Sequence, residues 1–328
     1  MKIRSLLFIA LLPATGVCAE PGRPVIKVGK DQVEFLMGNE LVTRYYIGHD
    51  IAKPYFWPLN APGNVPVTRG WPMERGLPKE TTDHVHQKSA WFCHGDVIPE
   101  GITVVPSADK HVKGVDTWSE GKGHGRIVCN SAEVQSGEWL RTENVWQDSA
   151  GTKILDETRA ISLHAAGAGR LIVLDIDLDA SVCSVTFGDT KEGSMGVRVN
   201  DQIRLAAKGT HSALVNADGK SGEASVWGML SDWCDYSGEI DGKLAGIALF
   251  DDPTNKPRAC WHSRGYGLMA ANPFGRSESG FPARKGDLQL VKLAKGEHLH
   301  LRYGIYLHQG NAKDGEVAAA FEQFTKLK

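Results

Sequence analysis

The feature that most constrains this fold is a period of two in the placement of apolar residues. Residues 174–179 read Leu-Asp-Ile-Asp-Leu-Asp, and residues 298–303 alternate polar and apolar side chains in the same way. Successive side chains of a β-strand point to opposite faces, so this pattern predicts half-buried strands. Apolar runs of strand length recur at 225–230 and 244–250. The chain is therefore expected to be built mainly of short strands.

Turn and helix signals complete the fold class. Gly38-Asn39 separates two alternating runs, which is typical of a tight hairpin. Only the C-terminus favours a helix, because Val317, Phe321, Phe324 and Lys328 fall on one helical face. Residues 57–82 hold five prolines and are expected to form a long ordered loop. Together these signals predict an all-β fold, a large antiparallel β-sandwich with long loops and a C-terminal helix.

The first nineteen residues have the pattern of a secretory signal peptide. Lys2 and Arg4 precede the apolar run 6–12, and Val17-Cys18-Ala19 offers a cleavage site. We therefore expect an exported protein, periplasmic or extracellular, with residues 20–328 forming a single β-sandwich domain. No later stretch is apolar enough to span a bilayer, and a net charge of −2 gives no basic excess for nucleic acid. Neither integral membrane association nor nucleic-acid binding is expected.

Five cysteines remain after the predicted leader, and none is in a CxxC pair. A zinc knuckle is therefore not expected. Export would permit disulfides, but an odd number leaves at least one thiol free. The sequence leaves open whether the others pair or are simply buried apolar side chains.

The densest chemical motif is residues 83–96, which hold three histidines. On an extended strand His84 and His86 would share one face, with Lys88 continuing it. Two neighbouring imidazoles can bind a metal, transfer protons or hold a polar ligand. A metal-free polar site is favoured, because no third ligand stands at a diagnostic spacing; Asp83, His94, Glu157 or His262 would have to supply it. No cofactor is required, although a divalent metal is compatible with the pattern.

Two further segments combine charged and aromatic residues. Residues 187–198 hold three glycines with Lys191, Glu192 and Arg198, and a Lys beside a Glu can form an acid–base couple. The alternative is a charged hairpin tip. Residues 260–275 contain Trp261, His262, Arg264, Tyr266 and Asn272, and on a strand His262, Arg264 and Tyr266 would share a face.

Aromatic faces beside Arg, His and Asn are how proteins hold sugars. The alternative for residues 260–275 is an aromatic core strand. Residues 231–238 alternate aromatic and acidic side chains at Trp233, Asp235 and Tyr236, which fits a loop beside a pocket or a tight turn on a buried Trp. Glu157 in the run 156–159 is a candidate base, although cross-strand ion pairing is favoured there.

These motifs resemble the signature of a PmoA-like family, a bacterial family labelled after a methane oxygenase subunit. The resemblance rests on Asp83-His84-x-His86 through Trp91-Phe92-x-His94-Gly95-Asp96-Val97, on Lys191-Glu192-Gly193, on Trp261-His262-x-Arg264-x-Tyr266-Gly267 and on 271–275. It extends from about Gly38 to about His308. The chain departs from the commoner pattern at Gln87, Lys88, Ser89-Ala90 and Ile98-Pro99.

The resemblance implies a secreted β-sandwich protein in a carbohydrate setting. Methane oxidation is discarded, because a membrane subunit needs spanning helices that this sequence does not predict. The first hypothesis is an exported carbohydrate-active enzyme, a lyase or hydrolase acting on a glycan fragment or modified glycoside. The second is a non-catalytic carbohydrate-binding protein, and the third is a His-ligated metal or redox protein.

In the enzyme hypothesis the acid–base residues are His84, His86, Lys191 and Glu192. No pair of acids at the spacing of a two-carboxylate glycosidase is evident, which favours a lyase. The residues expected to bind the carbohydrate are Trp91, His94, Arg198, Trp233, Asp235, Tyr236, Trp261, His262, Arg264 and Asn272.

Overall fold

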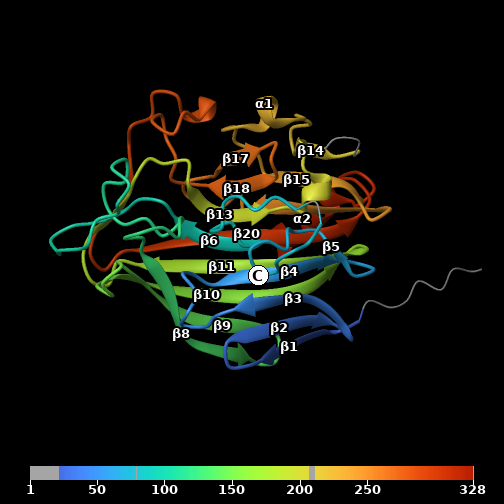
Figure 1. Cartoon of the computed structure of the whole chain (residues 1–328), viewed down its shortest axis with the longest axis horizontal. Coiled ribbons are helices and arrows are strands. Elements are labelled where there is room, and N and C mark those ends of the chain that lie inside the picture. The colour runs from blue at the N-terminus through green and yellow to red at the C-terminus, as the bar shows by residue number, and fades with distance from the viewer. Residues whose placement is uncertain (1–21, 79, 207–210, 328) are drawn as a thin grey trace, which may run out of the picture.

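The computed structural model describes residues 22–78, 80–206 and 211–327, so the predicted leader at 1–19 lies outside the described residues. Antiparallel strands are the main secondary structure and form two large sheets and one small one (Figure 1). The predicted all-β sandwich with a C-terminal helix is confirmed. The division into a leader and one domain stays a prediction.

The larger sheet has nine strands. In order across the sheet they are β1 (Pro24–Val28), β2 (Gln32–Met37), β3 (Glu40–Tyr46), β4 (Tyr55–Ala61), β6 (Ala90–His94), β13 (Gly193–Arg198), β18 (Leu268–Asn272) and β17 (Cys260–Arg264), with β5 (Val65–Pro66) paired to β4. Strands β2 and β3 form the hairpin predicted around Gly38-Asn39.

The second sheet has eight strands and the third has three. The eight are, in order, β14 (Ala213–Asn216), β15 (Trp233–Ile240), β16 (Lys243–Asp251), β20 (His298–Gln309), β11 (Gly169–Asp179), β10 (Lys153–Ala166), β9 (Trp139–Gln147) and β8 (Arg126–Gln135). The three are β19 (Val291–Leu293), β12 (Val185–Phe187) and β7 (Val97–Pro99).

Helices are few and short. The C-terminal helix α2 (Val317–Lys326) packs Val317 and Phe324 against Phe250 and Tyr306 of the eight-stranded sheet, in a second apolar cluster. The other helical elements are α1 (Glu223–Val226) and the two 3₁₀ turns η1 (Asp201–Ile203) and η2 (Pro282–Arg284).

The main core lies between the two large sheets. Phe92 of β6 contacts Trp146 of β9 and Tyr303 of β20, with ring centroids 6.1 Å apart in both pairs. A buried polar bridge crosses the same space. The Arg159 guanidinium of β10 donates to Tyr45 Oη (3.0 Å) and to the Phe92 carbonyl (3.2 Å) in the larger sheet.

Outside the histidine segment, three sequence expectations about elements are wrong. Residues 57–82 are not one loop, because β4 and β5 occupy their first part. The run 225–230 starts inside helix α1 instead of forming a strand, and residues 233–238 form the first part of strand β15 instead of a loop or turn. In the last case strand residues buried on both faces lack the alternation that marks a half-buried strand.

The five cysteines of the described chain are all buried and unpaired. The question left open by the sequence is thereby answered in favour of buried thiols. Burial raises the pKa of Cys93 to about 12, and the pKa of Cys129 to about 11, so these thiols are held in their neutral form.

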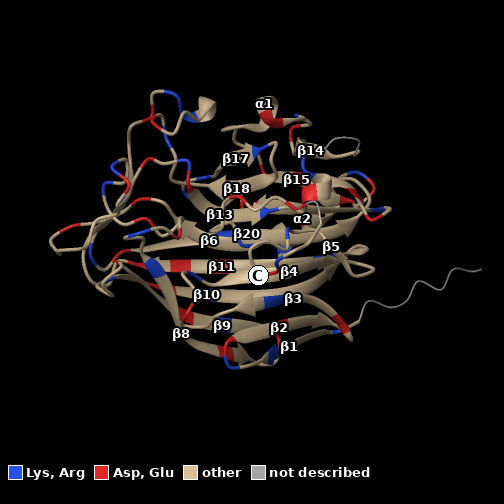
Figure 2. Ribbon diagram, viewed as in Figure 1, with Lys and Arg blue, Asp and Glu red and all other residues tan. Residues whose placement is uncertain are grey.

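Charged side chains of both signs are scattered over loops and strands (Figure 2). Within residues 22–78, 80–206 and 211–327, no helix has the length and hydropathy needed to cross a membrane.

Candidate functional site

A row of side chains crosses the outer face of the nine-stranded sheet. Phe92 faces the core, so its neighbour Trp91 points the other way. Strand register places Tyr55, Trp91, Gly196, Ala270 and His262 side by side on β4, β6, β13, β18 and β17. The two small residues at the middle of this row leave room above the sheet.

Trp118 fills that room. Its ring centroid lies 5.0 Å from the Trp91 ring and 6.5 Å from the His262 ring. A Cβ atom on Gly196 would lie only 2.8 Å from Trp91 Cζ2 and 3.1 Å from Trp118 Cη2. Trp118 lies in the segment between β7 and β8. The buried Lys53 ammonium holds this segment by donating to the Trp118 carbonyl at 2.7 Å. Trp118 therefore forms the floor of the site.

Beside this row three side chains stack on one another. The Arg198 guanidinium lies 4.7 Å from the Tyr266 ring centroid, and the His84 ring lies 5.1 Å from the Tyr266 ring at an interplanar angle of 5°. Arg198 and Arg264 occupy the same register row, each opposite Leu268. Tyr266 itself lies in the turn between β17 and β18, not on strand β17. Its ring nevertheless covers the same sheet face as Arg198, near the side of Arg264.

Asp83 ties His84 to this stack. Its Oδ1 accepts from Arg69 (2.5 Å) and Arg198 (2.9 Å), and its Oδ2 lies 3.0 Å from His84 Nδ1. Burial raises the pKa of Asp83, but Arg198 and the hydrogen bonds from Arg69 and His84 outweigh it, and the pKa falls to about 2. Asp83 is therefore an anion, and His84 Nδ1 is the donor. In the neutral imidazole this leaves Nε2 of the half-exposed His84 as a proton acceptor.

The predicted strand through His84, His86 and Lys88 is wrong. The Gln87 amide donates to the His84 carbonyl at 2.9 Å, which closes a turn, and His84 has φ of 44°. The turn still brings the two rings together, with centroids 5.7 Å apart, but Lys88 pairs instead with Glu120 at 2.6 Å. Burial, followed by the charge of Lys53, lowers the pKa of His86 to about 3, so His86 stays neutral.

Glu192 is held over the same face by its backbone. Its carbonyl accepts from the Gly95 amide at 2.7 Å. The carbonyl of Lys191 accepts from His262 Nδ1 (2.6 Å) and Asn272 Nδ2 (3.1 Å). Burial raises the pKa of Glu192 to about 7, although the charges of Lys191 and Arg264 oppose the shift. Near neutral pH this carboxyl group is divided between its acid and carboxylate forms.

Arg264 supplies a partly exposed cation next to Glu192. Its guanidinium stacks on Trp227 at 3.8 Å and pairs with Glu223 at 3.1 Å. Trp227 also contacts His262, with ring centroids 5.0 Å apart. Burial, then the charge of Arg264, lowers the pKa of His262 to about 3, so its imidazole remains neutral.

The outer-face cluster is defined here as His84, His86, Trp118, Glu192, Trp227, His262, Arg264 and Tyr266. It combines a carboxyl group that titrates near pH 7, a base oriented by Asp83, one cation and several aromatic rings. Burial raises the pKa of Tyr266 and the nearby charge of Glu192 adds to this shift, while His84 stacks on the same ring. Such a set can give a proton, take a proton and stabilise negative charge.

The structure brings together many of the residues singled out from the sequence. His84, His86, Glu192, His262 and Arg264 belong to the cluster, and exposed Lys191 stands at its rim.

Five predicted binding residues are buried in supporting positions. Trp91 lies beneath Trp118, and Trp261 donates through Nε1 to the Ser231 carbonyl at 2.9 Å. His94 contacts the Gly188 carbonyl at 2.9 Å, and Asn272 holds the backbone of residues 190–191. The side chain of Arg198 is fully buried beneath Tyr266 and Asp83.

Three others lie on strand β15 in the eight-stranded sheet. Trp233 packs with the C-terminal helix cluster, and Asp235 pairs with the buried His308 at 2.7 Å. Tyr236 donates to the Arg264 carbonyl at 2.5 Å, which supports the cluster from beneath. Glu157, weighed as a base, is fully buried with Arg159 in the core.

The structure also adds residues to the predicted set. Trp118 and Trp227 come from segments with no chemical pattern, and Arg69 reaches Asp83 from the proline-rich stretch. Their only signal in the sequence is residue type. Tyr266 and Asp83 stood inside quoted motifs.

The metal alternative finds no support in the side-chain geometry. In the part of the chain that the structure describes, no three His, Cys, Asp or Glu side chains converge closely enough to hold a metal ion. Of the third ligands considered, His94 and Glu157 have partners in the core, away from His84 and His86.

The sequence model of a family of unknown function, DUF6807, matches residues 32–322. The chain belongs to this family. The expected membership of a PmoA-like family is wrong, because the matching family is DUF6807 and nothing in the match links it to a PmoA-like family. A search of curated proteins finds no match.

Solved structures resemble this DUF6807 member weakly. One is a galactose mutarotase-like protein from Lactobacillus casei. It is 13% identical, and the match covers 87% of this chain and 100% of that chain at a TM-score of 0.36. Another is a galactose mutarotase related enzyme from Lactobacillus acidophilus. It is 8% identical, and the match covers 88% of this chain and 98% of that chain at a TM-score of 0.33. A third is the galactosidase domain of an α-galactosidase–sucrose kinase. It is 8% identical, and the match covers 87% of this chain and 42% of that chain at a TM-score of 0.37. Similarity at these TM-scores carries no functional argument.

Proposed function

We propose that this protein is an exported carbohydrate-active enzyme that works by general acid–base catalysis at the outer-face cluster. The observation that carries the proposal is that Glu192, whose pKa is raised to about 7, and His84, whose Nδ1 is bound to Asp83, both lie beside the Tyr266 ring. Perturbed carboxyl groups next to oriented imidazoles are typical of catalytic sites. Export is proposed from the leader pattern at residues 1–19.

The proposed reaction is a β-elimination on a sugar unit that carries a carboxylate or keto group. His84 Nε2 takes the proton from the carbon next to that group, and a C=C bond forms as the C–O bond at the β-carbon breaks. The leaving oxygen takes the proton of Glu192. Arg264 faces the negative charge that builds up on the carboxylate or carbonyl oxygen. Exchange with water then returns both groups to their starting states.

The cluster supports elimination over two-carboxylate hydrolysis. Hydrolysis of that kind needs a second free acid beside the first. The acid whose charge adds to the raised pKa of Glu192 is Asp116, and it already accepts the Trp118 and Ser119 amides at 2.7 and 3.0 Å.

The test is a screen of the purified protein against glycan fragments that contain uronic acids or keto sugars, with mass detection of products. Elimination breaks a bond without adding water, so the summed product masses equal the substrate mass. Glu192→Gln should lower kcat by about 10²–10⁴-fold. Glu143→Gln, a half-exposed carboxylate in the other sheet, is the matched control and should keep wild-type turnover.

Other outcomes would overturn parts of the proposal. Products that gain one water for each bond broken would show hydrolysis in place of elimination. Binding of fragments without turnover would indicate a carbohydrate-binding protein. Wild-type turnover by a correctly folded Glu192→Gln variant would remove Glu192 from the mechanism.

A further inference from the structure

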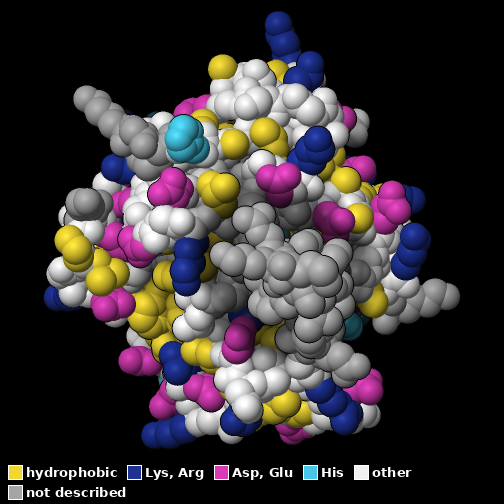
Figure 3. All heavy atoms as spheres, turned by 90° about the vertical axis from the view of Figure 1, so that its right-hand side faces the viewer, with side chains coloured by type: hydrophobic (Ala, Val, Ile, Leu, Met, Phe, Trp, Pro, Cys, Tyr) yellow, Lys and Arg dark blue, Asp and Glu magenta, His cyan; other side chains and the backbone are white. Residues whose placement is uncertain are grey.

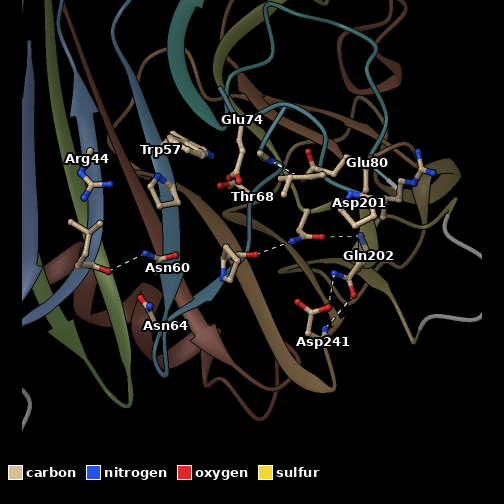
Figure 4. Close-up of a pocket in the computed structure, with 18 residues that line it drawn as sticks. Arg44, Trp57, Asn60, Asn64, Thr68, Glu74, Glu80, Asp201, Gln202 and Asp241 are labelled. Carbon is tan, nitrogen blue, oxygen red and sulfur yellow. Dashed lines mark hydrogen bonds between the residues drawn. The ribbon is translucent and has the colours of Figure 1, made fainter. Parts of the chain in front are cut away.

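A second feature of the molecule lies beside the outer-face cluster and takes no part in the proposed chemistry. It is a pocket of about 900 Å³, at the upper end of the range that holds small organic ligands. Figure 4 shows Trp57 and Asn60 of β4 on one side of it, with Gln202 and Asp241 on the other. Glu74 and Glu80, from the chain after β5, also line it.

The pocket has an unsatisfied polar group in its wall. The side chain of Asp201 is 4% exposed. Its Oδ2 accepts from the backbone amide and the hydroxyl of Thr81, at 2.5 and 2.7 Å. Within the described chain, Oδ1 has no hydrogen-bond partner, and Arg198 Nη2 lies 4.0 Å away. This oxygen is shielded from solvent, so Asp201 contributes negative charge to the wall of the pocket and makes no direct contact with a ligand.

The charges of the pocket select against an anion. Four acidic residues and two basic residues line it. The acids are Glu74, Glu80, Asp201 and Asp241, and the bases are Arg44 and Arg204. Arg44 is in addition paired with Glu34 at 3.1 Å. On the described part of the face shown in Figure 3, acidic and basic side chains are intermingled with apolar ones. A neutral ligand with hydroxyl donors meets these carboxylates without charge repulsion.

The apolar part of the wall includes one aromatic ring, Trp57, beside Leu41, Leu77 and three prolines. Trp57 is half-buried, and its ring lies 6.3 Å from the ring of Tyr46. Amide side chains of Asn60, Asn64 and Gln202 surround the same space. An aromatic face with amides and carboxylates around it matches a sugar ring, which has C–H faces and a rim of hydroxyl groups.

We infer that this pocket is a subsite for neutral sugar units of the substrate whose charged or keto unit reaches the outer-face cluster. The inference rests on the proposed function for its choice of substrate. The two places are joined by one hydrogen-bonded segment. Thr81, which donates to Asp201, accepts from Arg198 Nη2 at 3.2 Å, and Arg198 holds Asp83 beside His84.

The experiment measures binding by calorimetry on the full chain, so that it does not depend on turnover. The probes are cellotetraose, xylotetraose and mannotetraose as neutral chains, tetragalacturonate as an acidic chain and a glucosamine tetramer as a basic one. At least one neutral chain should bind. Trp57→Ala should weaken that binding at least 10-fold, and Gln202→Ala, on the opposite wall, at least 3-fold. Trp139→Ala, a half-buried Trp on the other sheet, is the matched control and should bind as the wild type does.

Several results would overturn the subsite. These are no binding by any neutral chain, equal binding by the Trp57→Ala and wild-type proteins, or Trp57-dependent binding of the acidic or basic tetramer that is tighter than that of every neutral chain. Glu192→Gln should keep the Trp57-dependent binding. Turnover that needs Glu192, with binding indifferent to Trp57, would end the subsite and leave the enzyme proposal intact. Trp57-dependent binding without turnover would end the enzyme proposal and leave the sugar-binding pocket intact.

Discussion

At the scale of single residues, the site depends on two carboxyl groups whose pKa values are shifted in opposite directions. Asp83 lies between two arginines, which keep it ionised despite partial burial. Glu192 is more deeply buried and meets only one nearby exposed lysine and the paired Arg264, so burial prevails and its pKa rises. Two carboxyl groups whose environments separate their pKa values can take different roles in one reaction.

This difference predicts the pH dependence of catalysis. If Glu192 is the acid, it must be protonated, so kcat/KM should fall as pH rises through about 7, the pKa of this group. The Glu192→Gln variant should lack that falling limb, because its amide does not titrate. The measurement is kcat/KM from pH 5 to 9. A rising limb near pH 7 that vanishes in the variant would instead make Glu192 the base.

The residue types of the site were predictable, but their grouping only in part. His262 and Arg264 share a face because both lie on β17, as alternation predicts. Trp233 and Asp235 lie elsewhere, because strand β15 belongs to the other sheet, and the sequence does not state which sheet a strand joins. Trp118 and Arg69 enter through long-range contacts that leave no local pattern.

At the scale of elements, β13 depends on having no side chain at Gly196. The register row leaves a space above β13 and β18, and the rings of Trp91 and Trp118 occupy it. A glycine inside a strand is often a place where another group approaches closely. Here the approaching groups are the aromatic floor of the site.

Gly196→Ala should therefore disturb the floor. Its Cβ would lie 2.8 Å from Trp91 Cζ2, so the rings must shift. The expected loss is about 1–3 kcal/mol in the free energy of unfolding, as for other overpacked sites. The measurements are denaturant unfolding and near-ultraviolet circular dichroism. Gly121→Ala is the control, since a Cβ there meets nothing within 4 Å, and it should leave both unchanged. Equal stability of the two variants would contradict the packing described.

Elements with a strict period were predictable from the sequence. The β2–β3 hairpin, the acid-alternating β11 and the terminal helix α2 are all confirmed. The histidine segment was not, because the turn at His84 to Gln87 depends on the positive φ of His84, and its stack on Tyr266 joins residues far apart in the chain. Tertiary contacts decided the conformation there, against the local pattern.

At the scale of the whole molecule, a buried polar bridge through Glu157 and Arg159 helps to join the two large sheets. Glu157 of β10 accepts from Asn144 Nδ2 (2.8 Å) and Trp146 Nε1 (2.7 Å), and it pairs with Arg159. Arg159 then reaches Tyr45 and Phe92 in the opposite sheet. All the charges of the bridge are removed from water, so each partner depends on the other.

Glu157→Gln should expose that dependence. Removing one member of a buried ion pair leaves the other charge uncompensated, which costs about 3–5 kcal/mol. The free energy of unfolding from urea titration checks the value. Glu143→Gln, whose carboxylate pairs with Arg141 at the surface of β9, should change it by less than about 1 kcal/mol. A similar small loss for Glu157→Gln would mean that the bridge contributes little to joining the sheets.

The buried, unpaired thiols have a practical consequence. None of the five cysteine side chains in the described chain is tied to another, and each is sheltered inside the fold. Whatever compartment the protein reaches, its sandwich is assembled without covalent crosslinks between these sulfur atoms. We therefore expect it to fold in a reducing host cytoplasm and to keep its fold in dithiothreitol, with no oxidative refolding step.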